Sequence, residues 1–469
     1  MKKFSTKLIS MMMACSLLGA VVCGCSDNSK TVSQDEKIKI TIGDWPTKEE
    51  PEYPIQEALK AKFEEKYPNI EISTDEWGFH VNTFLQKAAS GQLPSVYVTS
   101  FTEIKRIIDT GYAADVTKHM QTSGFDSKMR EDVLDIISKD GKIYAVPSNT
   151  YVMGLYINMN LFEKAGLINS DGTPKIPRTW EQVAEYSQII REKTGQAGFV
   201  LPTMKNTGGW HFINMAWAYG ANPELMNKEG DKWTADFSGA ECTQALQFVK
   251  DLRWKYNAIP ENALIEHSKA VEMFATDKAA MFLCTPGWNA LTDTYGMDKD
   301  KIAMASMPAG PAGKCTQMGG TLYVLKGGMT DEEVDACFKW LEFSGVSPNL
   351  TDDAKASMEE EYKANVAQNR VTGIKRFSMW KDGEDVEVEK YTDELIKKYK
   401  NVDSKLFADY ESFADIKIIP EPPVNCQQLY AALDGCIQKV IAEESADPAA
   451  LLKSAENDFQ LNYLDGVNF

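Results

Sequence analysis

The stretch Gly141–Leu167 reads G-K-I-Y-A-V-P-S-N-T-Y-V-M-G-L-Y-I-N-M-N-L-F-E-K-A-G-L, and the interpretation of the whole chain starts from it. Its apolar and β-branched residues predict two neighbouring strands, over Lys142–Pro147 and Val152–Asn158. A short helix is predicted directly after them, over Leu161–Gly166. We expect the chain to cross here from one lobe of the protein to a second lobe.

The residues before this stretch alternate between strand and helix patterns. Lys37–Asp44 and Asn69–Glu76 alternate apolar and polar residues, and Pro54–Tyr67 between them has a helical period. This strand–helix–strand order predicts an α/β lobe with a mostly parallel sheet covered by helices. The further elements expected in this lobe are a helix over Asn82–Ser90, a strand over Ser95–Ser100 and a helix over Glu103–Asp109.

The residues after the stretch predict a second α/β lobe. Its helices have recognisable starts, because a hydroxyl residue followed three positions later by Glu or Gln can form a capping box. Such pairs occur at Thr179 with Gln182, Ser238 with Glu241 and Thr330 with Glu333. Strands are expected between the helices, over Gly198–Leu201, Ala279–Cys284 and Lys301–Ser306.

The last third of the chain predicts a return to the first lobe. Met304–Leu325 is rich in Gly and Pro and ends in a predicted strand, Thr321–Leu325, so we interpret it as the return crossing. Asp352–Lys400 mixes acids and lysines and predicts solvated helices, and two amphipathic helices follow over Asn425–Glu443 and Ala446–Tyr463. We assign 37–159 and part of 301–350 to the first lobe, 160–300 to the second, and 351–469 to helical segments that pack on the lobes.

The N-terminus has the pattern of an export signal. Met1–Lys7 is basic and Leu8–Val22 is an apolar run too short for a comfortable membrane-spanning helix, so residues 1–24 predict a secretory signal peptide. The sequence V-C-G-C-S around Cys25 resembles a bacterial lipobox, which implies that Cys25 becomes the lipidated first residue. Residues 25–36 then form a polar, flexible tether. The alternative is an ordinary signal peptide with incidental cysteines.

Composition narrows the class of protein and of partner. The chain has 469 residues, of which 43% are hydrophobic and 25% charged, as in soluble globular proteins. A net charge of -18 repels phosphate backbones, so we expect no nucleic-acid partner. An acidic polysaccharide would need a local basic site, for which Lys205, Arg253 and Lys314 are the candidates.

The usual enzyme signatures are missing from the sequence. It contains no phosphate-binding or dinucleotide-binding glycine motif, no H-E-x-x-H and no G-x-S-x-G, which leaves no predicted catalytic residue, cofactor or metal. A pair of glycosidase carboxylates stays open, because their pairing depends on distance and not on spacing in the sequence. Beyond Cys25 there are six cysteines without a C-x-x-C pair, either buried thiols or disulfides.

Tryptophans at loop positions are the most informative side chains. Trp45 and Trp77 follow the first two predicted strands, Trp210 follows Gly208-Gly209, and Trp288 follows Pro286-Gly287. Strand ends of open α/β sheets face the ligand crevice, where an indole offers a flat apolar face to a sugar ring. These residues therefore suit a neutral polyol ligand, with packing inside a lobe as the alternative.

Several longer segments carry a family resemblance in a fixed order. Lys62–Gly111 contains F-E-E-K-Y-P-N-I-E-I, F-L-Q-K-A-A-S-G-Q-L-P-S-V and I-K-R-I-I-D-T-G, and P-R-T-W-E-Q-V follows the crossing stretch at Pro177–Val183. Pro286–Trp288 and Met307–Tyr323, which ends in G-G-T-L-Y, come later. Together with Gly141–Leu167 these segments resemble the family 1, maltose-binding-protein-like solute-binding proteins of ABC importers. Ser95 departs from the Asp that this family usually has after the preceding proline.

The resemblance implies an α/β, two-lobed periplasmic-binding-protein type II fold with a hinge and a ligand cleft between the lobes. It implies stacking platforms at Trp45, Trp210 and Trp288, and hydroxyl partners at Glu76 and Asn149. The remaining positions that fall near the cleft by this resemblance are Trp77, Ser100, Tyr151, Gly320 and Tyr323.

The resemblance also implies a function without catalysis. The chain is expected to be a monomeric lipoprotein at the extracellular face of the cell membrane, which captures a carbohydrate and delivers it to the membrane subunits of an ABC permease. Two alternatives stay open. One is a receptor with the same fold for a peptide or another solute, and the other is a secreted glycoside-active enzyme.

Overall fold

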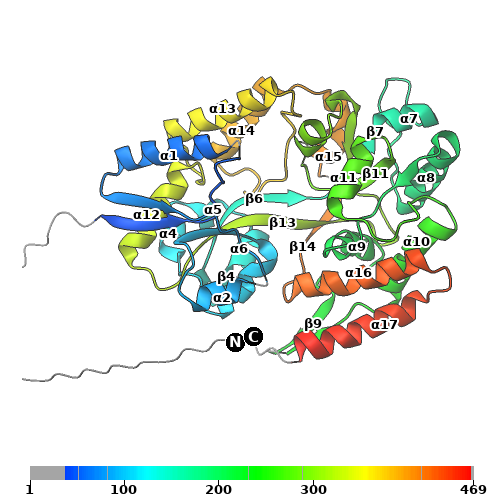
Figure 1. The fold of residues 1–469 in the computed structure, drawn as a ribbon, viewed down its shortest axis with the longest axis horizontal. Helices are drawn as coiled ribbons and strands as arrows, with labels where there is room; N and C mark the ends of the chain where they lie inside the picture. Colours follow the sequence, from blue (N-terminus) through cyan, green and yellow to red (C-terminus); the bar gives the residue numbers. More distant parts are fainter. Residues whose placement is uncertain are drawn as a thin grey trace, which may run out of the picture. The chain divides into compact units, whose positions relative to one another are not determined.

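The predicted strand–helix–strand start forms β1 (Ile38–Ile42), α1 (Tyr53–Lys66) and β2 (Ile70–Thr74), and β1 pairs with β2 in parallel. The alternation has the expected effect, because Ile40 and Ile42 are buried whereas Lys39 is exposed. The computed structural model describes residues 37–465 apart from 51, 82, 231, 288 and 414 (Figure 1). The predicted signal peptide, Cys25 and the tether lie outside the described residues.

The sheet of the first lobe, which we call lobe 1, is mixed. Its order is β14-β13-β3-β1-β2, and β6 also pairs with β13, over residues 318 to 323 of β13. The pairs β1–β2, β1–β3 and β13–β14 are parallel, so the prediction of a mostly parallel sheet is confirmed; the exception is that β13 runs antiparallel to β3 and to β6. The physical reason is that β13 enters this sheet as the return crossing from the second lobe and not through a helical crossover within lobe 1. The bounds are Val96–Ser100 for β3, Val146–Val152 for β6, Lys314–Leu325 for β13 and Ile416–Pro420 for β14.

The crossing stretch extends farther in β structure than its sequence suggests. A break was expected over 148–151, but β6 continues through it because Asn149, Thr150 and Tyr151 pair with Thr321, Gly320 and Gly319 of β13. β7 (Gly154–Asn158) then enters the sheet of the second lobe, lobe 2, whose order is β12-β7-β11-β8. Figure 1 shows β6 and β13 crossing side by side between the lobes. The other strands of lobe 2 are β8 (Ala197–Phe199), β11 (Ala279–Cys284) and β12 (Ile302–Ala305).

Helix starts in the structure test the predicted caps. Thr330 caps α12 (Asp331–Phe343) with a full capping box to Glu333, as predicted. Thr179 caps α8 (Trp180–Thr194) by accepting the N–H of Gln182, but the Gln182 side chain accepts from Arg178 instead. The prediction at Ser238 was wrong, since α10 (Ala240–Trp254) begins after Gly239 and the Ser238 hydroxyl donates to Glu456 at 2.7 Å.

Two apolar cores hold the elements together. In lobe 2, α9 (Thr207–Ala218) packs on α16 (Cys426–Ala442), and the close approach is possible because Gly209 of α9 lies against the backbone of Tyr430. α17 (Pro448–Phe459) packs on the other side of α16 (Figure 1). Glu456 of α17 accepts the backbone N–H groups of Phe237 and Ser238, both at 2.8 Å, and so anchors the base of the hairpin formed by β9 (Met226–Glu229) and β10 (Lys232–Ala235).

The segment 351–413 is tied to both lobes. The carbonyl of Met379 accepts the N–H of Arg130 in lobe 1 at 3.0 Å, and Asp409 accepts the N–H of Ser306 in lobe 2 at 2.9 Å. Its helix α13 (Asp352–Ala367) is largely exposed, as predicted, but Phe377 and Trp380 are buried. Figure 1 shows α13 and α14 (Glu387–Tyr399) on the opposite side of the crossing strands from β4 (Ser138–Lys139) and β9.

The six cysteines of the described part are free and buried. Burial raises the pKa of the thiols of Cys242, Cys284 and Cys337 to about 12.

No helix within residues 37–465, as far as they are described, is long and apolar enough to span a bilayer. The other elements named in Figure 1 or below are α2 (Phe84–Ala89), η1 (Phe101–Glu103), α3 (Ile104–Asp109), α4 (Thr117–Thr122), α5 (Phe125–Lys128), α6 (Glu131–Ile137), β5 (Lys142–Ile143), α7 (Met159–Ala165), α11 (His267–Ala275) and α15 (Ala408–Glu411).

Candidate ligand site

Polar and aromatic side chains gather where the crossing strands meet lobe 2. Tyr151 of β6 covers Gly319 of β13, and a Cβ at Gly319 would overlap the tyrosine ring. Beside them, Glu421 follows β14 and accepts the hydroxyl of Tyr430 at 2.9 Å. We call Tyr151, Trp210, Gln317, Glu421 and Tyr430 the crossing cluster. It draws its members from both crossings and from two helices of lobe 2.

Trp210 is the stacking candidate that the fold brings to this cluster. When the Gln317 amide is oriented so that its nitrogen donates to the Trp210 carbonyl at 3.1 Å, its oxygen accepts the indole N–H of Trp210, and the indole also stabilises the Glu421 carboxylate. The first turn of α9 is fixed by Asp434 of α16, which accepts the N–H groups of Asn206 and Gly209, both at 2.8 Å. The Trp210 residue is only partly buried.

Glu421 is the most unusual ionisable group of the cluster. Burial raises its pKa to about 7, hydrogen bonds from Tyr430 and Trp210 oppose that rise, and the nearby carboxylate of Glu103 adds to it. Glu103, from η1 of lobe 1, has a raised pKa for the same main reason, burial. The charge of the Glu103 carboxylate therefore contributes to the raised pKa of Glu421.

We expect Glu421→Gln to change how stability depends on pH. The folded-state pKa lies above the ordinary value of 4.5 for Glu, so the wild-type chain loses stability as pH rises from about 4.5 to about 7. Gln cannot ionise, so the variant should equal the wild type near pH 4 and exceed it at pH 8 by about 1 to 3 kcal/mol. Urea unfolding at both pH values measures this difference. Parallel stability curves for the two proteins would contradict the assignment.

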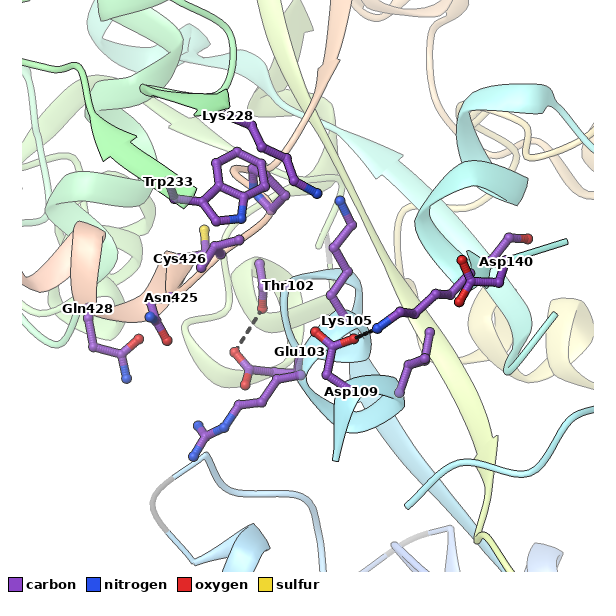
Figure 2. Close-up of a pocket in the computed structure, with 16 residues that line it drawn as sticks. Thr102, Glu103, Lys105, Asp109, Asp140, Lys228, Trp233, Asn425, Cys426 and Gln428 are labelled. Atoms are coloured by element: carbon purple, nitrogen blue, oxygen red, sulfur yellow. Dashed lines mark hydrogen bonds and ion pairs between the residues drawn. The ribbon is translucent and has the colours of Figure 1, made fainter. Parts of the chain in front are cut away.

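A cavity of about 330 Å³ lies between the lobes (Figure 2). Lobe 1 contributes Thr102, Glu103 and Lys105, and lobe 2 contributes Lys228 and Trp233 of the β9–β10 hairpin. The cavity also touches the start of α16. A second cavity of about 300 Å³ shares Lys105 and Pro423 with the first and is lined by Phe101 and Glu421. The space between the lobes therefore continues from the hairpin to the crossing cluster.

Of the residues that the sequence analysis selected, Tyr151 and Trp210 lie in the crossing cluster and two others contact the cavity wall. The Ser100 hydroxyl hydrogen-bonds Thr102 at 2.8 Å, and Gly320 lies against the ring of Phe101. Thr102 lines the first cavity and Phe101 the second. None of the nine described candidates lines either cavity itself. Trp288 lies outside the described residues.

The other candidates lie elsewhere in lobe 1. Trp45 is 5% exposed, packs against Trp340 at a ring distance of 6.2 Å and donates its indole N–H to Glu57 at 3.1 Å. This is the geometry of a core tryptophan, because the ring is enclosed and its N–H is satisfied within the lobe. We therefore leave Trp45 out of the proposed site.

Trp77 and its neighbours are also held by contacts within lobe 1. The ammonium of Lys87 lies 4.7 Å from the centroid of the Trp77 ring. Glu76 is exposed, and so is Asn149, whose side-chain amide donates to the Ser148 hydroxyl at 3.2 Å. Tyr323 is half-buried, and its pKa is raised by burial and, to a smaller extent, by the charge of Asp44.

The cavity is lined by residues that the sequence analysis did not select. Glu103 and Lys105 directly follow a strand end, and Glu421 follows β14 within Pro420–Pro423, so the rule that ligands bind at strand ends could have indicated them. Lys228 and Trp233 come from a hairpin for which the sequence offers no functional signal. The three basic candidates named from sequence were wrong for this cavity: Lys205 pairs with Glu266, Arg253 with Glu261, and Lys314 starts β13, and none of them is a lining residue.

Comparison with known proteins agrees with this arrangement. The family model described as bacterial extracellular solute-binding protein matches residues 45–345. A putative binding protein of Brucella abortus (strain 2308) is 22% identical over 280 residues, which are 59% of this chain and 64% of that protein, so the match spans less than two thirds of the relative. The arabinooligosaccharide-binding protein of Bacillus subtilis (strain 168) is 24% identical over 406 residues, 84% of this chain and 85% of that protein.

Solved structures share the fold. The structure of maltose-bound T. maritima MalE3 superimposes with a TM-score of 0.64 at 18% identity and covers 90% of this chain and 99% of its own. The two mixed sheets joined by crossing strands are thus the two lobes of a type II periplasmic-binding fold. The family model covers well over half of the chain, and the chain belongs to the bacterial extracellular solute-binding protein family.

Proposed function

We propose that this protein is the substrate-binding lipoprotein of an ABC importer, which captures an oligosaccharide between its lobes and delivers it to the permease. The observation that carries this proposal is the cavity whose walls come from both lobes and which adjoins a second cavity lined by Glu421 of the crossing cluster. The sugar ligands named for the relatives support the ligand class. The family's binding proteins support a role without catalysis.

Closure would then couple binding to delivery. A ligand that contacts both lobes is bound more tightly by the closed form than by the open form, so it shifts the population toward closure. The permease is proposed to recognise the closed form. The crossing strands serve as the hinge, since they and the segment 351–413 carry the connections between the lobes.

The anchor is part of the same proposal. Cys25 is proposed to carry the lipid that holds a monomeric receptor at the extracellular face of the membrane, with residues 25–36 as the tether. Metabolic labelling with a palmitate analogue tests this point. A Cys25→Ser chain that still carries the label would overturn it.

Trp210→Ala is expected to weaken sugar binding at least 10-fold, because truncation removes the ring of a partly buried residue together with an indole N–H. The measurement is titration calorimetry on the chain from residue 26 onward, with linear arabino-, malto- and xylo-oligosaccharides. Trp254→Phe is the matched control, because Trp254 donates its N–H to Val440 inside lobe 2.

Product analysis after each titration separates the receptor from an enzyme. Intact sugar supports the receptor, whereas cleaved sugar would favour a glycoside hydrolase that uses Glu103 and Glu421. A panel of sugars without any binding would contradict the carbohydrate ligand and favour a peptide or another solute.

A further inference from the structure

Two lysines from different lobes face each other across the first cavity. Lys105 projects from α3 of lobe 1 and Lys228 from β9 of lobe 2, and Figure 2 shows their ammonium groups pointing toward one another. Within the described part of the chain, neither lysine forms an ion pair with a carboxylate within 4.0 Å. Burial lowers the pKa of Lys105, the charge of Glu224 acts against this, the charge of Lys228 lowers the pKa further, and Asp109 and Asp135 raise it. Two like charges thus lie near each other, and within the described residues neither is in direct contact with a carboxylate.

Two of the three acidic residues that line this cavity are engaged by other groups. Asp109 is engaged by Lys139 in an ion pair, and Asp140 lies on the far side of that pair (Figure 2). Glu103 accepts the hydroxyl of Thr102 at 3.2 Å, and burial raises its pKa while the neighbouring Arg106 lowers it. The lining of this cavity therefore has a small excess of cationic side chains, with Lys105, Arg106, Lys139 and Lys228 against Glu103, Asp109 and Asp140, although the chain as a whole has a net charge of -18.

The surroundings of Lys228 suit a ring that bears a negative charge. The ammonium of Lys228 lies 5.3 Å from the centroid of the Trp233 ring, so an apolar surface adjoins the cationic one. The first turn of α16, a helix of 17 residues, also lines the cavity, and helix N-termini favour negative charge. Cationic, apolar and dipolar groups are thus combined within one cavity that both lobes enclose.

We propose that the captured oligosaccharide contains a uronic acid, and that its carboxylate lies between Lys105 and Lys228. This inference rests on the proposed function and specifies its ligand. A carboxylate between the two ammonium groups replaces their repulsion by two attractions. Because the lysines belong to different lobes, the same contact favours closure, which links the charge of the sugar to the conformational change. A neutral sugar would leave the repulsion in place.

The test compares sugars that differ only in the carboxylate. The probes are α-1,4-linked trigalacturonate against α-1,4-linked galactotriose, and glucuronic-acid-substituted xylotriose against xylotriose. We expect the acidic member of at least one pair to bind at least 10-fold more tightly in titration calorimetry. Lys105→Gln and Lys228→Gln should each reduce the affinity for the acidic sugar about 10-fold and leave the affinity for the neutral sugar unchanged. Each variant's melting temperature confirms that it is folded.

Lys205→Gln is the matched control, because Lys205 belongs to lobe 2, pairs with Glu266 and does not line the cavity. Equal or tighter binding of the neutral sugars, or an acidic preference that survives both cavity variants, would overturn the uronic acid but leave the receptor intact. Preference for a phosphorylated sugar over both uronates would also overturn it, since the anion would then be a phosphate. Absence of binding by every sugar, acidic or neutral, would contradict the proposed function together with this inference.

Discussion

Gly209→Ala is expected to destabilise the protein by about 3 kcal/mol or to prevent its folding. A Cβ at this position would lie 2.5 Å from the Cα and from the carbonyl oxygen of Tyr430. These are backbone atoms of α16, which cannot move aside as a flexible side chain can, so α9 and α16 would have to separate. The separation would also weaken the bond from the Gly209 N–H to Asp434, which fixes the first turn of α9. Urea unfolding at pH 7 measures the loss.

Gly435→Ala provides the matched control on the partner helix. Gly435 is exposed within α16, and its Cβ would meet no atom within 4 Å. Alanine should therefore stabilise the protein by about 0.5 to 1 kcal/mol through its higher helix propensity. If both substitutions shifted stability in the same direction, the contact between α9 and α16 would not be the reason for the glycine at 209.

Glu456→Ala is expected to destabilise the protein by about 3 kcal/mol at pH 7. Glu456 is 8% exposed and accepts the N–H groups of Phe237 and Ser238 as well as the Ser238 hydroxyl. Alanine would leave two backbone donors without their acceptor at the base of the hairpin, which is a costly loss in a buried place. The hairpin carries Lys228 and Trp233, so binding of the acidic sugar should weaken as well.

The loss should depend on pH in a defined direction. Burial alone would raise the pKa of Glu456, but hydrogen bonds from Lys453, Ser238 and the two backbone donors outweigh it, so the pKa lies below the ordinary value for Glu. A depressed folded-state pKa means that this stabilisation is complete above about pH 4.5 and is lost as pH falls through the folded-state pKa. The difference between wild type and variant should therefore shrink in acid.

Lys453→Ala separates the carboxylate's backbone contacts from its ion pair. The Lys453 side chain is 61% exposed, and its ion pair with Glu456 has a distance of 2.8 Å. Removing an exposed partner should cost less than 1 kcal/mol. A loss as large as that of Glu456→Ala would show that the ion pair, and not the backbone acceptor role, stabilises this region.

Two kinds of strand were predicted well from the sequence. They are strands that pair with a neighbour close in the chain, and strands made of a continuous apolar run. β11 was predicted with its observed bounds, because A-A-M-F-L-C is buried on both faces and flanked by polar residues. β13 was predicted only over its last part, from residue 321. Its first residues, K-C-T-Q-M-G-G, have no strand pattern, and their extended structure is imposed by pairing with β14 and β6.

The site was harder to predict, because a tryptophan after a strand can turn toward either side. Trp45 turns into lobe 1, where Trp340, from a distant part of the chain, packs against it. Trp210 instead lies at the crossing cluster, because Asp434 and Gly209 fix the turn before it. The approach of Lys105 to Lys228 depends on how the two lobes face each other, which no local pattern in the sequence encodes.

The buried thiols give the molecule a set of internal reporters that need no engineering. A thiol reacts as its thiolate, and burial keeps Cys337 in lobe 1 and Cys242 in lobe 2 both protonated and out of contact with solvent. Modification at either one therefore requires its own core to open. Alkylation followed residue by residue by mass spectrometry would then give a separate opening rate for each lobe. Because a bound ligand joins the lobes, it would lower the alkylation rates of Cys337 and Cys242 together.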